Sequence, residues 1–180
     1  MSNATYPNPG IKWGLIAGVV AVIAGIVLYL TDALVLFSLK FSGILLIIYS
    51  ISALMAGLEK KRRQSGMLGI REGLQPVFTT FVIGSLMSTL FTYVLVNYID
   101  PSVTAQMKQS AIESYKAMEN VSRAMGATQQ DYEKGLADLQ AQQDFRLTFA
   151  GSFLLYLRGL ILYFVVSLLL ALTIRKQRTA

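Results

Sequence analysis

Two basic side chains, Lys40 and Arg158, interrupt stretches of sequence that are otherwise apolar enough to cross a membrane. A charge inside a bilayer is costly, so such residues usually face an interface, an opposite charge or a polar cavity. Counted from the outer ends of their predicted spans, both lie roughly 9–12 Å deep, at similar height. Three interpretations stay open. The side chains snorkel to the interface, they pair with an outer acid (Asp32, Asp100 or Asp144), or they share a positive pocket for an anion, a lipid phosphate or a partner's carboxylate.

Other kinds of chemistry find little support in the sequence. The chain has no cysteine and no histidine, which excludes thiol nucleophiles, cysteine-based zinc sites and histidine acid–base catalysis. No nucleophile or phosphate-binding motif is present, and no acid lies inside an apolar stretch. We therefore expect no enzyme activity, no catalytic residue, no metal site and no cofactor.

The composition points to the membrane. Hydrophobic residues make up 54% of the 180, and charged residues only 14%, against roughly 25% in a soluble domain. Four apolar runs, at 11–30, 34–57, 76–99 and 150–174, reach the length of about 20 residues that a membrane helix needs. We predict an all-α, polytopic membrane protein with four transmembrane helices, and membrane lipids as contacts.

The distribution of basic residues predicts the orientation. The basic residues that follow the second and fourth spans are Lys60, Lys61, Arg62, Arg63, Arg71, Arg175, Lys176 and Arg178. Basic segments stay in the cytoplasm, so we expect both termini and a basic loop over 58–75 to be cytoplasmic, and 100–147 to be periplasmic. This accounts for the net charge of +6, and we expect no nucleic-acid partner.

The organisation is a single domain in three parts. Residues 1–99 hold the first three spans, 100–147 form a helical hairpin, and 148–180 hold the fourth span and a basic tail. Pro76 suits the first turn of the third span. The alternative is a proline within a longer helix that starts near Leu68.

Apolar residues recur at helical spacing in the first half of the hairpin, after a helix start at Asp100-Pro101-Ser102. Gly126 suits the end of this helix, and Thr128 with Asp131 suits the start of a second. The two helices pack on each other, lie on the outer leaflet, or bind a partner; these alternatives stay open. The candidate interaction surface is Val103, Met107, Tyr115, Met118 and Met125.

Small residues recur every four positions in two spans. Gly14 and Gly18 begin such a series in the first span, and Thr80, Gly84 and Ser88 form one in the third. Such stripes allow helices to approach closely, either within one bundle or between chains.

Several stretches resemble one bacterial membrane-protein family. They are IKWGLIAGVV near the N-terminus, MLGIREGLQPVFTTFVIG before and within the third span, and LFTYVLVNYIDPSVTAQMKQ at 90–109. The sequence is similar over essentially its whole length to the domain-of-unknown-function 4199 family, found mostly in Bacteroidota. The resemblance implies a four-span inner-membrane protein and implies no activity.

The absence of catalytic motifs and the presence of an interaction surface favour one function. We expect a non-enzymatic accessory or scaffold component that assembles with itself or with a larger membrane complex. The alternative is a protein that binds or transports an anion, a lipid or another small molecule through Lys40 and Arg158.

Overall fold

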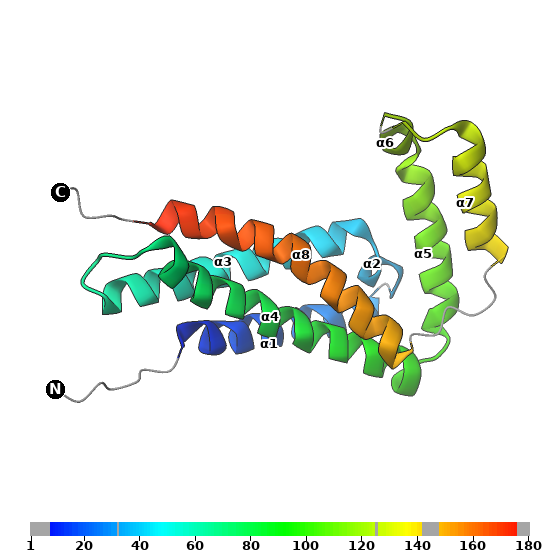
Figure 1. Cartoon of the computed structure of the whole chain (residues 1–180). Helices are drawn as coiled ribbons and strands as arrows, with labels where there is room; N and C mark the ends of the chain where they lie inside the picture. The colour runs from blue at the N-terminus through cyan, green and yellow to red at the C-terminus, as the bar shows by residue number, and fades with distance from the viewer. Residues whose placement is uncertain (1–7, 32, 125, 142–147, 176–180) are drawn as a thin grey trace.

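The computed structural model describes residues 8–31, 33–124, 126–141 and 148–175, and every regular element in these ranges is helical. Figure 1 shows a bundle of long helices with a group of shorter helices at one end. The elements are α1 (Pro9–Thr31), α2 (Ala33–Leu36), α3 (Leu39–Arg63), α4 (Ile70–Val94), the π-helical turn η1 (Leu95–Ile99), α5 (Val103–Ala117), α6 (Glu119–Ala124), α7 (Gln129–Ala141) and α8 (Phe149–Ile174).

Four of these stretches are long and apolar enough to cross a membrane: Pro9–Thr31, Lys40–Arg63, Ile70–Ile99 and Phe149–Ile174. Many of their large apolar side chains are exposed, for example Leu30 at 75% and Ile161 at 70%. An exposed apolar surface of this extent suits contact with lipid. The predicted all-α fold with four transmembrane helices is therefore confirmed.

The second span begins later than the sequence predicts. The chain breaks between α2 and α3 because Ser38 adopts an extended conformation, and its hydroxyl accepts a hydrogen bond from the Phe41 backbone N–H at 3.3 Å. Lys40 consequently lies in the first turn of α3 instead of six residues inside the span. At the other end α3 continues through Arg63, so the basic loop predicted over 58–75 shrinks to 64–69.

The third span begins earlier than Pro76. The Glu72 carboxylate accepts a hydrogen bond from the Gly69 backbone N–H at 3.3 Å, and this contact starts α4 at Ile70. Pro76 is buried inside the helix. The expectation that Pro76 begins the span is wrong, and the alternative of a proline within a longer helix is correct.

The small residues of α1 and α4 pack against each other inside this one bundle. A Cβ atom added at Gly14 would lie 2.8 Å from the Ile83 Cβ, and one added at Gly10 would lie 2.3 Å from the Pro76 carbonyl oxygen. Gly84 of α4 lies against Tyr49 of α3 and Ala17 of α1. The stripes of small residues are thus occupied within the chain, which removes them as surfaces for association.

Aromatic rings fill the middle of the bundle. Tyr49 of α3 meets Phe81 of α4 at 6.3 Å and Tyr163 of α8 at 6.0 Å between ring centroids. Phe81 and Tyr163 stack at 5.2 Å. Edge-to-face and stacked pairs of this kind stabilise packing beyond the burial of their area. These rings fix three helices relative to one another.

Polar contacts hold the end of the bundle that carries the basic residues. Glu59 of α3 accepts a hydrogen bond from the Trp13 indole N–H at 2.7 Å and pairs with Arg63 at 2.5 Å. The Lys61 ammonium donates to the carbonyl of Ile174, the last residue of α8, at 2.7 Å. The contacts join α1, α3 and α8 at this end.

Helices α5, α6 and α7 follow the third span, with α5 and α7 side by side (Figure 1). The rings of Tyr115 and Tyr132 stack at 5.2 Å, and the Lys108 ammonium donates to the Gln140 carbonyl at 2.7 Å. The side of the membrane on which these helices lie, and with it the extracytoplasmic hairpin, stays a prediction.

Most of the residues predicted to end or begin these helices are confirmed in that role. Gly126 has a φ of +94°, as a glycine that ends a helix often does. The Thr128 hydroxyl and the Asp131 carboxylate cap the start of α7, with a hydroxyl-to-carboxylate distance of 2.6 Å. Helix α5 begins at Val103, however, because Asp100 accepts from the Ser102 backbone N–H at 3.0 Å and holds a turn ahead of the helix.

Candidate functional site

A cavity of about 340 Å³ lies between α3, α4 and α8, in the half of the bundle that carries α5. Helices α3 and α8 meet at the opposite end through Lys61 and Ile174, and in the middle through Tyr49 and Tyr163. Beyond these rings they diverge, as Figure 1 shows. The cavity occupies the space that this divergence opens.

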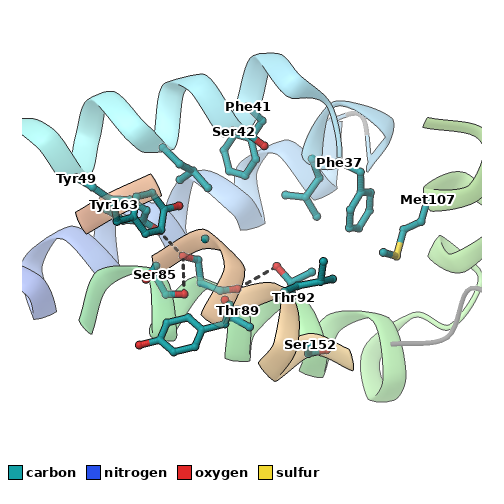
Figure 2. Close-up of a pocket in the computed structure, with 16 residues that line it drawn as sticks. Phe37, Phe41, Ser42, Tyr49, Ser85, Thr89, Thr92, Met107, Ser152 and Tyr163 are labelled. Atoms are coloured by element: carbon teal, nitrogen blue, oxygen red, sulfur yellow. Dashed lines mark hydrogen bonds between the residues drawn. The ribbon is translucent and has the colours of Figure 1, made fainter. Parts of the chain in front are cut away.

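Aromatic and aliphatic side chains form the two ends of the cavity. Figure 2 shows Tyr49 and Tyr163 at one end and Phe37 and Met107 at the other. Phe37 comes from the break between α2 and α3, and Met107 comes from α5. The break at Ser38 and the docking of α5 therefore both shape the site.

The lining is uncharged and rich in hydroxyl groups. None of the sixteen lining residues is acidic or basic, and nine of them carry a hydroxyl group. The hydroxyl groups belong to Ser42, Tyr49, Ser85, Ser88, Thr89, Thr92, Ser152, Tyr156 and Tyr163. Five lining residues are aromatic, so the surface combines flat apolar rings with neutral polar groups.

Most of the hydroxyl groups that face the cavity have protein partners. Ser85 donates to the Phe81 carbonyl at 2.6 Å, and Thr92 donates to the Ser88 carbonyl at 2.9 Å. Tyr49 and Ser88 share a hydrogen bond between their hydroxyl groups, drawn in Figure 2. Serine and threonine in helices commonly donate to the carbonyl four residues earlier, and their oxygens then remain acceptors.

Ser152 lacks such a hydrogen bond in the described part of the chain. Its side chain is buried, with 6% exposed, and its Oγ has no hydrogen-bond partner among the described residues. Most buried side-chain polar atoms are paired, because an unsatisfied one costs about 1–3 kcal/mol. Ser152 lines the main cavity and also a smaller one of about 120 Å³ between α4 and α8. Thr89 and Tyr156 line both cavities as well, so these three residues separate them.

The structure places Lys40 and Arg158 outside the cavity. Both side chains are exposed, and neither lines the site, although their neighbours Phe41 and Gly159 do. In the described part of the chain neither makes an ion pair. Asp100, a predicted partner of Arg158, instead accepts a hydrogen bond from Tyr29 at 2.9 Å. Asp32 and Asp144 lie outside the described residues.

The predicted interaction surface divides among three environments. Val103 is fully buried and Met107 lines the cavity, so both are used within the chain. Tyr115 packs on Tyr132. Met118 is 46% exposed, and Met125 lies outside the described residues. Among the described residues of the predicted stripe, Met118 at the tip is the one open to a partner.

The predicted topology residues lie together at the other end of the bundle. Lys60, Lys61, Arg62 and Arg63 form the last turn of α3, and Arg175 follows the last residue of α8. Lys176 and Arg178 lie outside the described residues.

The sequence analysis missed the residues that make the cavity. Ser88 belongs to a stripe of small residues that predicts helix packing, and no sequence pattern marks Ser152. A usable signal is present in two spans: hydroxyl residues concentrate around Ser42 in one half of the second span and around Ser88 in one half of the third, and Ser152 lies at the matching end of the fourth.

The fold and the cavity together define a four-span, all-α membrane protein with an uncharged cavity between its helices. The chain belongs to the family described as "Protein of unknown function (DUF4199)", whose family model matches residues 12–176. No curated protein and no solved structure matches the chain.

Proposed function

We propose that this protein is a non-enzymatic membrane protein that binds a neutral, lipid-like molecule in the cavity between α3, α4 and α8. One observation carries the proposal: a cavity without charge, lined by hydroxyl groups, in which the buried Ser152 hydroxyl has no protein partner.

The uncharged lining decides the charge of the ligand. Moving an ion from water into a low-dielectric site costs several kcal/mol unless an opposite charge compensates it. The sixteen lining residues offer no such charge, so an anion or a cation is unfavourable there. The proposal therefore keeps the lipid and small-molecule part of the sequence-based alternative and does not assign Lys40 and Arg158 to the site.

The position of the cavity supports a ligand that comes from the bilayer. Leu155, which lines the cavity, is 57% exposed, and the adjacent Leu154 is 53% exposed. The α8 wall of the cavity therefore reaches the lipid-facing surface, which gives the cavity an opening toward the bilayer. A long apolar tail bound in the cavity can extend through this opening into lipid.

The residues around the cavity suit binding better than catalysis. Most of its hydroxyl groups donate to carbonyls or to one another, and no lining residue is a carboxylate, an amine or an imidazole that would activate them. Such groups orient a ligand through hydrogen bonds. This supports a role in holding or presenting a molecule.

The test is to purify the protein from its native membrane in a mild detergent and to record native mass spectra. We expect a bound neutral species of defined mass.

Gly159 lines the cavity, and a Cβ there would meet only the Tyr163 ring, at 3.6 Å. Gly159→Leu should fill the space and remove the species. Gly43→Leu is the control, because nothing lies within 4 Å of a Cβ at Gly43. Equal occupancy in both variants would contradict the proposal.

We further propose that the protein lies in a bacterial inner membrane, with both termini cytoplasmic and 100–147 periplasmic. The support is the gathering of Lys60, Lys61, Arg62, Arg63 and Arg175 at the end of the bundle opposite α5. The cavity then belongs to the outer-leaflet half of the protein.

Assembly with a second copy or with a larger membrane complex is a second candidate function. One observation favours it: Met118 and Val121 are 46% and 47% exposed at the tip formed by α5 and α6. Methionine-containing apolar surfaces adapt well to partners. Met118→Glu with Val121→Glu should shift a complex purified in mild detergent to a smaller size. An unchanged size would contradict this role for the tip.

A further inference from the structure

We infer that the ligand is a neutral lipid whose head is a flat ring bearing carbonyl oxygens, the chemistry of an isoprenoid quinone, and that Ser152 selects it. This inference rests on the proposed binding function and adds the class of ligand and the residue that recognises it.

The first step is the hydrogen bond that Ser152 lacks. Ser85 and Thr92 already donate to carbonyls of their own helix, so their oxygens are left as acceptors. The Ser152 hydroxyl has no partner among the described residues and its oxygen is enclosed, so an acceptor on a ligand would reach its proton through a small movement of the cavity wall. A carbonyl oxygen supplies this acceptor without bringing a charge into the site.

The second step is the shape of the lining. Tyr49 and Tyr163 form one end of the cavity, Phe37 lies at the other, and Phe41 lies between them (Figure 2). Aromatic side chains present flat faces that pack favourably on another ring. A ring between these two ends would bring its edge toward the hydroxyl groups of α4 and α8.

The third step is size. A volume of about 340 Å³ lies near the lower end of the range of about 300–1,000 Å³ for small-molecule sites. It suits one substituted ring better than a phospholipid headgroup with two chains. The tail of such a ligand would leave past Leu155, which lines the cavity and is exposed to the bilayer.

The experiment uses the full-length protein in detergent micelles with three probes, and native mass spectrometry measures the bound fraction. Decylubiquinone has a ring, carbonyls and a ten-carbon tail. Decylbenzene has the ring and the tail without the carbonyls. Monoolein is a neutral lipid without a ring.

We expect the wild-type protein to bind decylubiquinone best. Ser152→Ala should weaken that binding about 3- to 10-fold, the range for one lost neutral hydrogen bond, and leave decylbenzene unchanged. Ser167→Ala is the matched control, since Ser167 is buried in the same helix, lies outside the cavity and donates to the Tyr163 carbonyl at 2.6 Å. It should bind decylubiquinone as the wild type does.

Thermal stability of the ligand-free protein is the second measurement. Ser152→Ala removes a buried hydroxyl that has no partner, so it should leave the melting temperature unchanged or raise it while binding falls. A combined loss of binding and stability would assign Ser152 a structural role and overturn the inference.

The remaining outcomes distinguish a failure of the inferred ligand class from a failure of the proposed binding function. If monoolein binds better than decylubiquinone, and Gly159→Leu abolishes its binding, the cavity binds neutral lipid and the inference about the ring fails. If Ser152→Ala binds decylubiquinone like the wild type, the inference also fails. If Gly159→Leu changes the binding of none of the probes, both the inference and the proposed function fail.

Discussion

Hydroxyl side chains inside membrane helices differ in whether their proton is already donated to a partner in the protein. Ser85, Ser88 and Thr92 each donate to a carbonyl four residues earlier, at 2.6, 3.1 and 2.9 Å. This satisfies the donor within the helix and leaves the oxygen toward the cavity as an acceptor. Ser152, whose hydroxyl has no partner among the described residues, therefore keeps a proton that it can donate to a ligand.

At the same scale, the residues that look most functional in the sequence are not those that form the site. Lys40 and Arg158 stand out because charge is rare in a span, yet both are exposed. Arg158 is ten residues into α8, and a long side chain can extend along the helix toward the interface. Serines and threonines attract less notice because most of them satisfy their hydrogen bonds locally, and only the fold shows which ones converge.

The contact between α1 and α4 gives the first prediction. At Gly14 an added methyl group would lie 2.8 Å from the Ile83 Cβ and 3.2 Å from the Thr80 carbonyl oxygen, and neither can move without shifting the helix. Gly14→Ala should lower the free energy of unfolding by about 1–3 kcal/mol, as overpacking usually does. The measurement is denaturant titration in detergent.

Gly43→Ala serves as the control for Gly14→Ala. A methyl group there meets nothing within 4 Å, so alanine should be neutral or stabilising by up to about 1 kcal/mol through its helix propensity. An equal destabilisation by both substitutions would mean that the close packing of α1 on α4 does not explain the effect.

Asp100 gives a prediction of pH dependence. Hydrogen bonds from the Ser102 hydroxyl and then from the Tyr29 hydroxyl hold the pKa of Asp100 below its ordinary value. A lowered pKa in the folded state means that the ionised carboxylate stabilises the fold above the unfolded pKa, about 4, and that this contribution is lost as the pH falls through the folded pKa.

Asp100→Asn should therefore reduce the loss of stability on acidification below about pH 4, measured as the melting temperature against pH. Asp131, whose pKa the Thr128 hydroxyl also lowers, still titrates in this variant and keeps part of the dependence. Asp138→Asn, on the exposed face of α7, should follow the wild-type profile. The prediction is wrong if the two variants respond to acid alike.

At the scale of elements, the sequence predicts which segments are helical better than where they begin. Apolar runs of the right length identify all four spans because burying or solvating a backbone in lipid requires a helix. Their ends depend on single polar groups. Ser38 moves the start of α3 inward, and Glu72 moves the start of α4 to Ile70, ahead of a proline that usually marks a first turn.

The end of α8 depends on a contact that pattern alone does not reveal. Lys61 of α3 donates from its ammonium to the carbonyl of Ile174 at 2.7 Å. The last carbonyls of a helix carry partial negative charge and favour a cation. Lys61→Met should lower the free energy of unfolding by about 1 kcal/mol.

The neighbouring basic residue provides the control for Lys61. Arg62 is exposed in the same turn of α3. Arg62→Met removes the same charge and should change the free energy of unfolding by less than about 0.5 kcal/mol. Equal losses in the two variants would show that the charge, and not the contact with Ile174, stabilises this end of the bundle.

At the scale of the molecule, the cavity arises from how three helices cross. Aromatic packing of Tyr49, Phe81 and Tyr163 fixes α3, α4 and α8 at mid-height, and the helices separate on one side of that point. Each helix alone resembles an ordinary membrane span. The cavity could not be predicted from the sequence because it depends on crossing angles, which follow from side-chain packing and not from hydropathy.

The uneven distribution of basic residues along the molecule gives the last prediction, which the absence of cysteine makes simple to test. The chain has no cysteine, so a single cysteine can be introduced without altering any native one. Ser65 lies in the short connection between α3 and α4, and Asn120 lies in α6 at the opposite end; both are exposed. Because basic residues gather beside Ser65, the positive-inside rule puts it in the cytoplasm and Asn120 in the periplasm. A membrane-impermeant maleimide applied to intact spheroplasts should therefore label Asn120→Cys at once and Ser65→Cys only after permeabilisation. The reverse labelling pattern would mean that the protein has the opposite orientation in the membrane. The cavity would then lie in the inner leaflet, and a ligand would enter from the cytoplasmic half of the membrane.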